Sequence, residues 1–129
     1  MGNKPGVADI DEIYPRIFQS DWFTAKSWEV IAQLKITHVV SVMQTRSEDF
    51  KEQGIQYFNI PVLDNVHANI LPHLHETNHF IASALSSNKE NRVLIHCAAG
   101  VSRSSTVALA YVMFVQPELG PKQALEMCR

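Results

Sequence analysis

The sequence predicts an α/β fold in which helices flank a central, mostly parallel sheet. Short β-branched, apolar segments typical of buried strands alternate along the chain with segments whose apolar residues recur at helical spacing. The clearest unit is VLIHCAAGVSRSSTVALAYVM, residues 93–113, in which an apolar strand and an apolar helix enclose a polar loop. Because ligands of such sheets bind beyond the carboxyl ends of the strands, we expect the functional site in this loop.

The first half of the chain is expected to contain short extended segments, a helix and a strand. Residues 1–10 read as a flexible lead-in, and the segment IYPRIFQS is extended, with Pro15 at an edge or turn. Apolar residues at helical spacing predict a helix over 24–34, with Thr24 as its cap. The β-branched segment HVVSVM, residues 38–43, predicts a buried strand. The polar connection that follows ends at Gly54 and suits a short surface helix.

The second half is expected to contain two strands and three helices. Residues 56–62 are again strand-like and lead into a loop. A helix is expected over 73–87 and a short buried strand over 92–95. The next helix, over 104–115, is apolar through most of its length, and a last helix begins after Pro121, a residue favoured at the first helical position.

Length and composition indicate one globular domain and exclude several classes of protein. The 129 residues are 46% apolar and 19% charged, and the net charge of -2 gives no basic surface for nucleic acid. No apolar run is long enough to span a membrane. Two cysteines, Cys97 and Cys128, form no disulfide framework, which favours a reducing compartment, the cytoplasm or also the nucleus. Gly2 supplies half of a myristoylation signal, but Gly6 replaces the required Ser or Thr, so a frayed terminus is the simpler interpretation.

The loop after the 92–95 strand has the groups that a phosphate ester needs for hydrolysis through a covalent intermediate. Cys97 is the candidate nucleophile, and the amides at the start of the next helix favour its anionic form. Gly100 allows a tight turn of the backbone. Arg103 can hold two phosphoryl oxygens in a bidentate fork, and Ser104 can donate a hydrogen bond to the departing sulfur. We expect His96 to orient the loop rather than to act as the acid.

A proton for the leaving oxygen must come from outside this loop. Asp64, in the segment VLDNVHANI, is the best candidate because it follows a strand and is flanked by apolar residues. It would act first as acid and then as base on the attacking water. The alternatives are that Asp64 is a turn or cap residue and that Cys97 is a small buried hydrophobe.

These residues resemble a known family. The segment HCAAGVSRS, residues 96–104, matches the H-C-x-x-G-x-x-R-S/T loop of cysteine-dependent protein phosphatases. Its particular sequence resembles that of the dual-specificity branch. The segments IYPRIFQS, LKITHVVSV and STVALAYVM are similar to the opening hairpin, first long strand and helix of that branch, and Asp64 falls at its acid position. The resemblance covers residues 11–129.

The resemblance implies a compact phosphatase α/β fold whose shallow pocket accepts phosphotyrosine, phosphoserine and phosphothreonine of proteins. It implies no metal and no cofactor. The residues implied to bind the phosphoryl group are Ala98, Ala99, Gly100, Val101, Ser102 and Arg103. The absence of lysine between the cysteine and the arginine argues for protein substrates over inositol lipids. Ser20 stands where the family commonly has glycine, and the chain is expected to lack the family's usual final helix.

Other functions and sites stay open at this point. A phosphoprotein-binding inactive fragment or pseudophosphatase is one alternative, and a phosphatase acting on lipid, RNA 5′ ends or glucan is another. A zinc site among His67, His73, His75 and His79 lacks a cysteine or carboxylate at a recognisable spacing. Core or shoulder packing is the expectation for Trp22, and a place at the border of the pocket is the alternative. The sequence does not fix the oligomeric state.

Overall fold

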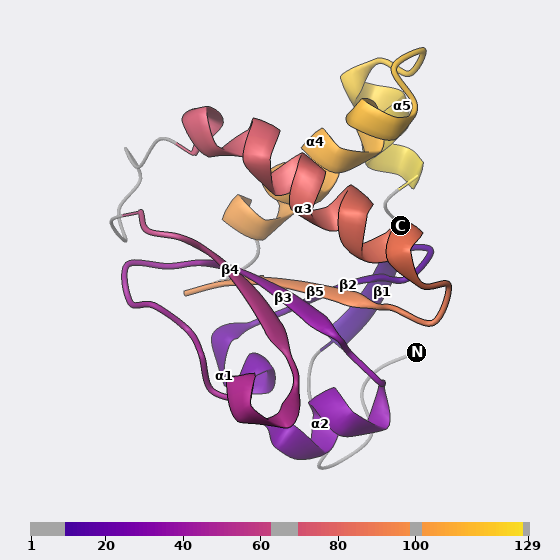
Figure 1. Cartoon of the computed structure of the whole chain (residues 1–129). Coiled ribbons are helices and arrows are strands. Elements are labelled where there is room, and N and C mark those ends of the chain that lie inside the picture. Colours follow the sequence, from indigo (N-terminus) through magenta and orange to yellow (C-terminus); the bar gives the residue numbers. More distant parts are fainter. Residues whose placement is uncertain (1–9, 63–69, 99–101, 128–129) are drawn as a thin grey trace.

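A five-stranded sheet forms the centre of the molecule (Figure 1). The computed structural model describes residues 10–62, 70–98 and 102–127. Strand order is β1-β2-β5-β3-β4; β1 is antiparallel to β2, and the other neighbours are parallel, which confirms the predicted mostly parallel sheet. The strands are β1 Ile10–Tyr14, β2 Ile17–Ser20, β3 His38–Val42, β4 Gln56–Ile60 and β5 Val93–Cys97.

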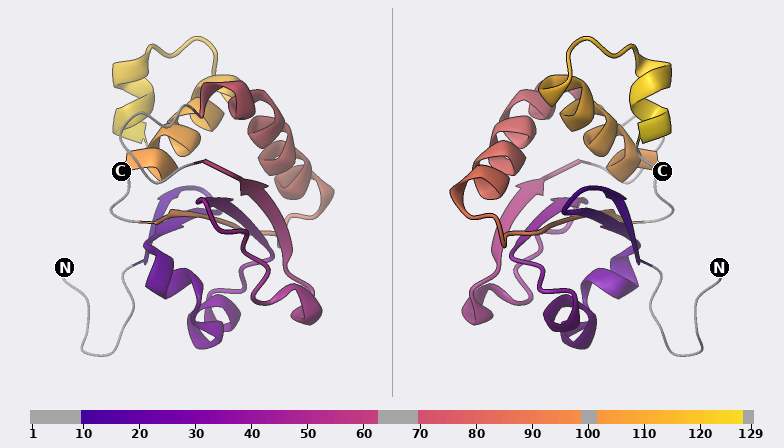
Figure 2. Two further views of the ribbon diagram at one scale, coloured as in Figure 1. Left: turned by 90° about the vertical axis from the view of Figure 1, so that its left-hand side faces the viewer. Right: turned by 90° about the vertical axis from the view of Figure 1, so that its right-hand side faces the viewer.

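Helices cover both faces of the sheet (Figure 2). The helices α3 and α4 lie on one face, α1 and α2 lie on the other, and α5 packs against α4. Their bounds are α1 Trp22–Ala25, α2 Trp28–Gln33, α3 Leu74–Ser87, α4 Ser102–Val115 and α5 Pro121–Met127, with 3₁₀ turns at Lys51–Gln53 and Leu71–His73. Among the described residues, no helix combines the length and the apolar character needed to cross a membrane.

The central strand β5 is shared by two hydrophobic clusters. All five of its residues are buried. Val93, Ile95 and Cys97 pack with residues of α3 and α4, whereas Leu94 packs with the cluster on the α1–α2 side. Burying a large aliphatic side chain stabilises the fold by about 1.5–3 kcal/mol, so both clusters fix the strand.

The predicted helix over 24–34 is two short helices. Asp21, not Thr24, caps the first, because its carboxylate accepts a hydrogen bond from the Thr24 amide at 2.8 Å. Ser27 then caps α2 through the Val30 amide at 3.4 Å. A serine hydroxyl competes with the helical backbone and favours a cap, so Ser27 interrupts the helix that the apolar spacing predicted.

Lys35 closes α2 in a left-handed conformation. Its φ is 57°, and its amide donates to the Ala32 carbonyl at 3.1 Å. The next amide, of Ile36, donates to the Ile31 carbonyl at 3.0 Å, which completes a Schellman motif. This motif turns the chain back into β3, next to β5.

The register brings the carboxyl ends of the parallel strands to one edge of the sheet. Ser20 of β2 and Ser41 of β3 both lie opposite His96 of β5, and Val42 lies opposite Cys97. The loops that follow these strands therefore emerge together. This edge is where the sequence predicts the site.

Candidate active site

Cys97 and Ser104 meet at the junction of β5 and α4. Cys97 is the last residue of β5 and is buried, and Ser104 lies in the first turn of α4 with no exposed surface. The Cys97 thiol donates a hydrogen bond to the Ser104 hydroxyl oxygen, with Sγ and Oγ 3.8 Å apart. The structure thus brings together two residues that the sequence assigned to nucleophile and leaving-group support.

Apolar packing aims the start of α4 at this junction. Val107, Ala108, Tyr111 and Val112 are buried at helical spacing and belong to α4. They hold the helix against the sheet, with its N-terminus at the end where Cys97 lies. The first amides of a helix lack intrahelical acceptors and carry partial positive charge, so this end of α4 favours an anion.

The other predicted loop residues are only partly described. Ala98 is half-buried and follows Cys97 directly, and Ser102 begins α4. Arg103 is half-buried in the first turn of α4. Ala99, Gly100, Val101 and Asp64 lie outside the described residues, as do His67 and Cys128, so their roles stay predictions.

Gln19 is a site residue that the sequence reasoning missed. Its side-chain Nε2 donates to Ser104 Oγ at 2.8 Å and to Ser105 Oγ at 2.9 Å. Ile17, two positions earlier on β2, belongs to the cluster under α3 and α4, so Gln19 points to the same face. A polar residue at an inward strand position, which must find a buried partner, was the signal available in the sequence.

His96 is buried on β5 between the two neighbouring strands. Burial lowers its pKa to about 4, because the charged imidazolium is poorly solvated there, and an interaction with the Cys97 backbone opposes the shift only in part. Within the described residues its Nδ1 has no hydrogen-bond partner. The imidazole is therefore neutral near pH 7, and its role in orienting the loop stays a prediction.

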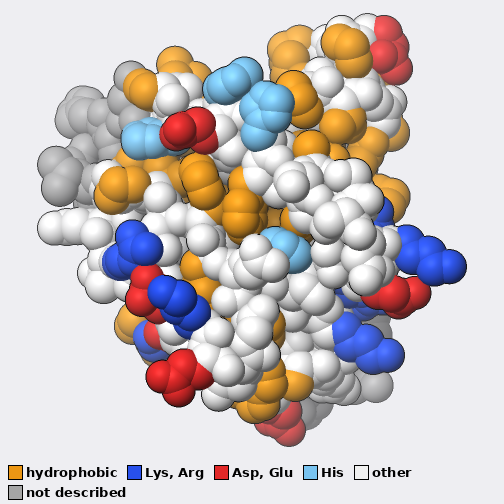
Figure 3. Space-filling model, viewed as in Figure 1, with side chains coloured by type: hydrophobic (Ala, Val, Ile, Leu, Met, Phe, Trp, Pro, Cys, Tyr) orange, Lys and Arg blue, Asp and Glu red, His pale blue; other side chains and the backbone are white. Residues whose placement is uncertain are grey.

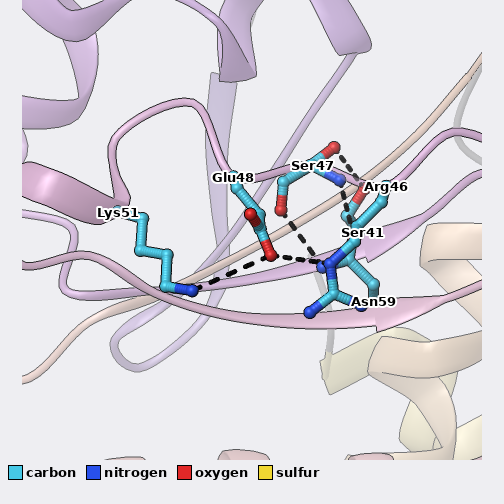
Figure 4. Close-up of polar contacts among 6 residues, drawn as sticks. All are labelled: Ser41, Arg46, Ser47, Glu48, Lys51 and Asn59. Atoms are coloured by element: carbon cyan, nitrogen blue, oxygen red, sulfur yellow. Dashed lines mark hydrogen bonds and ion pairs between the residues drawn. The ribbon is translucent and has the colours of Figure 1, made fainter.

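Asn59 fixes the loop that follows β3 (Figure 4). Its Oδ1 accepts from the Ser47 amide at 2.7 Å, and its Nδ2 donates to the Ser47 carbonyl at 3.1 Å. The Ser47 and Ser41 hydroxyls also bond at 2.9 Å. An amide side chain that pairs with a backbone amide in this way holds the loop against β4.

The charged residues of that loop form a surface network. Arg46 Nε lies 2.6 Å from Glu48 Oε2, and Lys51 Nζ lies 4.0 Å from the same oxygen. The hydrogen bond from Arg46, with the charge of Lys51, lowers the pKa of Glu48.

A hollow of about 410 Å³ lies between this network and β4. The residues that line it are Arg46, Glu48, Lys51, Gly54, Ile55, Gln56 and Tyr57. These lining residues do not include Cys97 or Arg103, so the hollow is separate from the predicted site.

The histidines of α3 pack with aromatic rings. The rings of His75 and His79 lie 4.6 Å apart, and His79 also contacts Phe114 at 5.6 Å. Histidine side chains gather beside hydrophobic ones over α3 (Figure 3). In the parts of the chain that the structure describes, no three His, Cys, Asp or Glu residues are grouped to hold a metal.

Trp22 begins α1, directly beyond the carboxyl end of β2. Its ring contacts Phe23 at 5.0 Å, and Lys26 Nζ lies 5.2 Å from its centroid. Phe23 is largely exposed. The helix α1 therefore starts shortly after the end of β2, which pairs with the end of β5.

Known proteins are similar to this chain in sequence and in fold. Residues 17–129 match the family model "Dual specificity phosphatase, catalytic domain". The chain is 34% identical to dual specificity protein phosphatase 13B of Homo sapiens over 113 residues, which are 83% of this chain and 57% of that protein. It is 36% identical to dual specificity protein phosphatase 15 of Rattus norvegicus over 126 residues, 98% of this chain and 49% of that protein.

A solved structure of DUSP15 superposes with a TM-score of 0.77 at 31% identity, covering 91% of this chain and 72% of that one. The chain spans about half the length of the two curated relatives, 57% and 49%. The matched residues include β2, β5 and α4, which carry Gln19, Cys97 and Ser104. By its sequence and by its fold, this chain belongs to the dual specificity phosphatase family, whose catalytic domain its residues 17–129 match.

Proposed function

We propose that this chain hydrolyses phosphotyrosine, phosphoserine and phosphothreonine in proteins through a cysteinyl-phosphate intermediate, without a metal or cofactor. The observation that carries the proposal is the 3.8 Å contact between Cys97 Sγ and Ser104 Oγ at the start of α4. It combines a nucleophile, a hydroxyl that can donate to the thiolate once the thiol proton is lost, and a helix N-terminus at one point. Membership of the family supports the reaction class.

In the first step, the Cys97 thiolate attacks phosphorus and the ester P–O bond breaks. Asp64 gives its proton to the leaving oxygen. The amides of residues 98–103 and the guanidinium of Arg103 hold the phosphoryl oxygens as negative charge spreads over them. The phosphoryl group is then bonded to Cys97 and the alcohol or phenol departs.

In the second step, water attacks phosphorus and the S–P bond breaks. Asp64, now a carboxylate, takes a proton from the water. The electron pair of the broken bond returns to Cys97 as a thiolate, which Ser104 stabilises by donating a hydrogen bond. Inorganic phosphate leaves, and the enzyme is ready for the next turnover.

The proposed substrates are phosphoproteins of signalling processes in the cytoplasm or nucleus. The positions between Cys97 and Arg103 carry no lysine, so the loop adds little charge for a polyanionic inositol lipid. The curated relatives are named as protein phosphatases, which supports the same substrate class.

The test compares the chain with Cys97→Ser on para-nitrophenyl phosphate in the presence of EDTA. We expect Cys97→Ser to lower kcat by at least ~10³-fold, because its hydroxyl is a much weaker nucleophile at neutral pH. Cys128→Ser, which changes the other cysteine, should keep the wild-type rate. Equal rates for the chain and Cys97→Ser would refute the mechanism.

A substrate panel tests the specificity separately. It contains one peptide with phosphotyrosine, the same peptide with phosphothreonine, a phosphoinositide and a 5′-triphosphorylated RNA. Faster release of phosphate from the peptides supports a protein phosphatase, and faster release from the lipid or RNA overturns that assignment. Cooperative thermal unfolding without any hydrolysis would refute the phosphatase proposal, and binding of the unhydrolysed phosphopeptide would then support a phosphoprotein-binding domain.

A further inference from the structure

The hydroxyl that faces Cys97 is itself held by a side chain from another strand. Gln19 of β2 reaches across to the first turn of α4 and donates to Ser104 and Ser105 at 2.8 and 2.9 Å. Ser104 in turn lies 3.8 Å from Cys97 Sγ. A polar chain thus runs from Gln19 through Ser104 to the sulfur.

The donor and acceptor roles along this chain are set by chemistry. A glutamine Nε2 has two hydrogens and no acceptor, so it gives one to each serine oxygen. In the structure the Cys97 thiol donates to Ser104 Oγ. When the sulfur is a thiolate it can only accept, so the direction of this hydrogen bond reverses and the Ser104 hydroxyl donates. A hydroxyl that already accepts a hydrogen bond is a stronger donor, because successive hydrogen bonds polarise one another.

Serines in helices have a competing use for their proton. A serine hydroxyl can instead form a hydrogen bond with neighbouring backbone groups. Gln19 occupies one side of the Ser104 oxygen and thereby limits the directions left for its proton. The bond to Ser105 at 2.9 Å fixes the plane of the glutamine amide.

We propose that Gln19 is a positioning residue for breakdown of the phosphoenzyme: it orients the Ser104 hydroxyl as a donor to the departing Cys97 sulfur. The proposal rests on the proposed function. In the step concerned, water bonds to phosphorus, the S–P bond breaks, Asp64 takes the water proton, and the sulfur leaves as a thiolate. Gln19 exchanges no proton in this step and acts only through Ser104.

This role predicts a particular kinetic signature. The ratio kcat/KM reports events up to formation of the phosphoenzyme, whereas kcat also includes its hydrolysis. In Gln19→Met, which keeps the side-chain length and loses the donor, we expect kcat to fall about threefold to tenfold. KM should fall in proportion, and para-nitrophenol should appear in a burst before the steady state.

Gln19→Glu tests the donor role of Gln19 more strictly than Gln19→Met does. A carboxylate has only acceptor atoms, so it draws the Ser104 proton away from the sulfur and adds negative charge near a thiolate. We expect a larger loss of kcat than in Gln19→Met. If Gln19→Glu turned over as fast as the wild type, the proposed donor role would be wrong.

Gln56→Met is the matched control. Gln56 is also a glutamine on a parallel strand, but it lies at the opposite end of the sheet, where β4 begins. It should show wild-type kcat, KM and no burst. A burst in Gln56→Met equal to that in Gln19→Met would overturn the assignment to Gln19.

A double-mutant cycle tests whether Gln19 acts through Ser104. Ser104→Ala should itself give a burst and a low kcat, and adding Gln19→Met to it should cause no further loss. An equal loss of kcat from Gln19→Met in the wild-type and Ser104→Ala backgrounds would overturn the proposal.

A readout without turnover separates this proposal from the proposed function. Alkylation of Cys97 by iodoacetamide, followed by mass spectrometry of its peptide, reports how readily the thiolate forms. We expect the midpoint of the pH profile to move to higher pH in Gln19→Met, with no such move in the Ser104→Ala background. If the chain hydrolysed no substrate, the proposed function would fail and this profile would still decide the role of Gln19. An unchanged midpoint in Gln19→Met would overturn the proposal in an active or inactive chain.

Discussion

The guanidinium of Arg16 donates a hydrogen bond to the Leu85 carbonyl at 2.9 Å and so ties the β1–β2 turn to the end of α3. The same side chain donates to the carbonyls of Asn88 and Asn91, each at 3.1 Å. The last carbonyls of a helix have no intrahelical donor, and a cation there also complements the helix dipole. Arg16 therefore closes the connection from α3 into β5, which leads to Cys97.

Replacing this arginine should destabilise the fold without changing the chemistry. Arg16→Met keeps most of the apolar stem and loses three charge-assisted donors, so we expect the free energy of unfolding to fall by about 2–3 kcal/mol. Urea unfolding measures this change. Arg46→Met, which removes an exposed arginine paired with Glu48, is the control and should change it by less than about 1 kcal/mol. Equal effects of the two substitutions would show that Arg16 has no special role.

Asp64→Asn should slow hydrolysis of substrates with a poor leaving group more than hydrolysis of substrates with a good one. Asparagine cannot supply a proton, so we expect kcat to fall by about 10²–10⁴-fold on phosphoserine, whose alkoxide is a poor leaving group. The loss should be smaller on para-nitrophenyl phosphate, because the activated phenolate leaves without a proton. Steady-state rates on both substrates test this, with binding of phosphate or vanadate expected to change little. A rate equal to that of the wild type on all substrates would assign the acid role to another residue.

The stability of the fold should depend on pH through His96. Its pKa is about 4 in the folded chain and near 6.5 when unfolded, so the unfolded state binds a proton first as the pH falls. The folded state therefore loses stability between about pH 6.5 and pH 4, and nothing is lost at neutral pH. By pH 4.5 this linkage amounts to about 2–3 kcal/mol.

His96→Asn should reduce the dependence of the free energy of unfolding on pH, whatever the substitution does to that free energy at pH 7. The measurement is the free energy of unfolding in urea at pH 7 and at pH 4.5 for each protein. His75→Asn, which replaces an exposed histidine of α3, should keep the wild-type difference between the two pH values. If His96→Asn lost as much stability as the wild type on acidification, the buried neutral imidazole would not be its cause.

The β5–loop–α4 unit could be predicted because its signals are local. An apolar strand, a reactive loop and an apolar helix follow each other in the sequence, and each is recognisable without its neighbours. The mostly parallel sheet followed from the alternation of strands and helices. The residues Cys97 and Ser104 meet, as expected, because strand and helix fix both ends of a short loop.

Two features that the sequence did not predict, the break between α1 and α2 and the contacts of Gln19, each depend on one or two hydrogen bonds. The chain breaks between α1 and α2 because Ser27 caps α2 instead of continuing the first helix. The helical spacing of apolar residues runs on across this break, so it gave no sign of it. Gln19 finds its partners in α4, 85 and 86 positions further along the chain. Such pairs need the three-dimensional register of β2 beside β5, which no local pattern contains.

The placement of β5 between two hydrophobic clusters determines how the molecule unfolds. Its side chains alternate between the clusters, and it is hydrogen-bonded to β2 on one edge and to β3 on the other. Neither half of the core can open without releasing the backbone beneath Cys97. Cys97 therefore lies on a segment that is held on both faces and both edges, so loss of its environment on heating should coincide with cooperative melting of the domain.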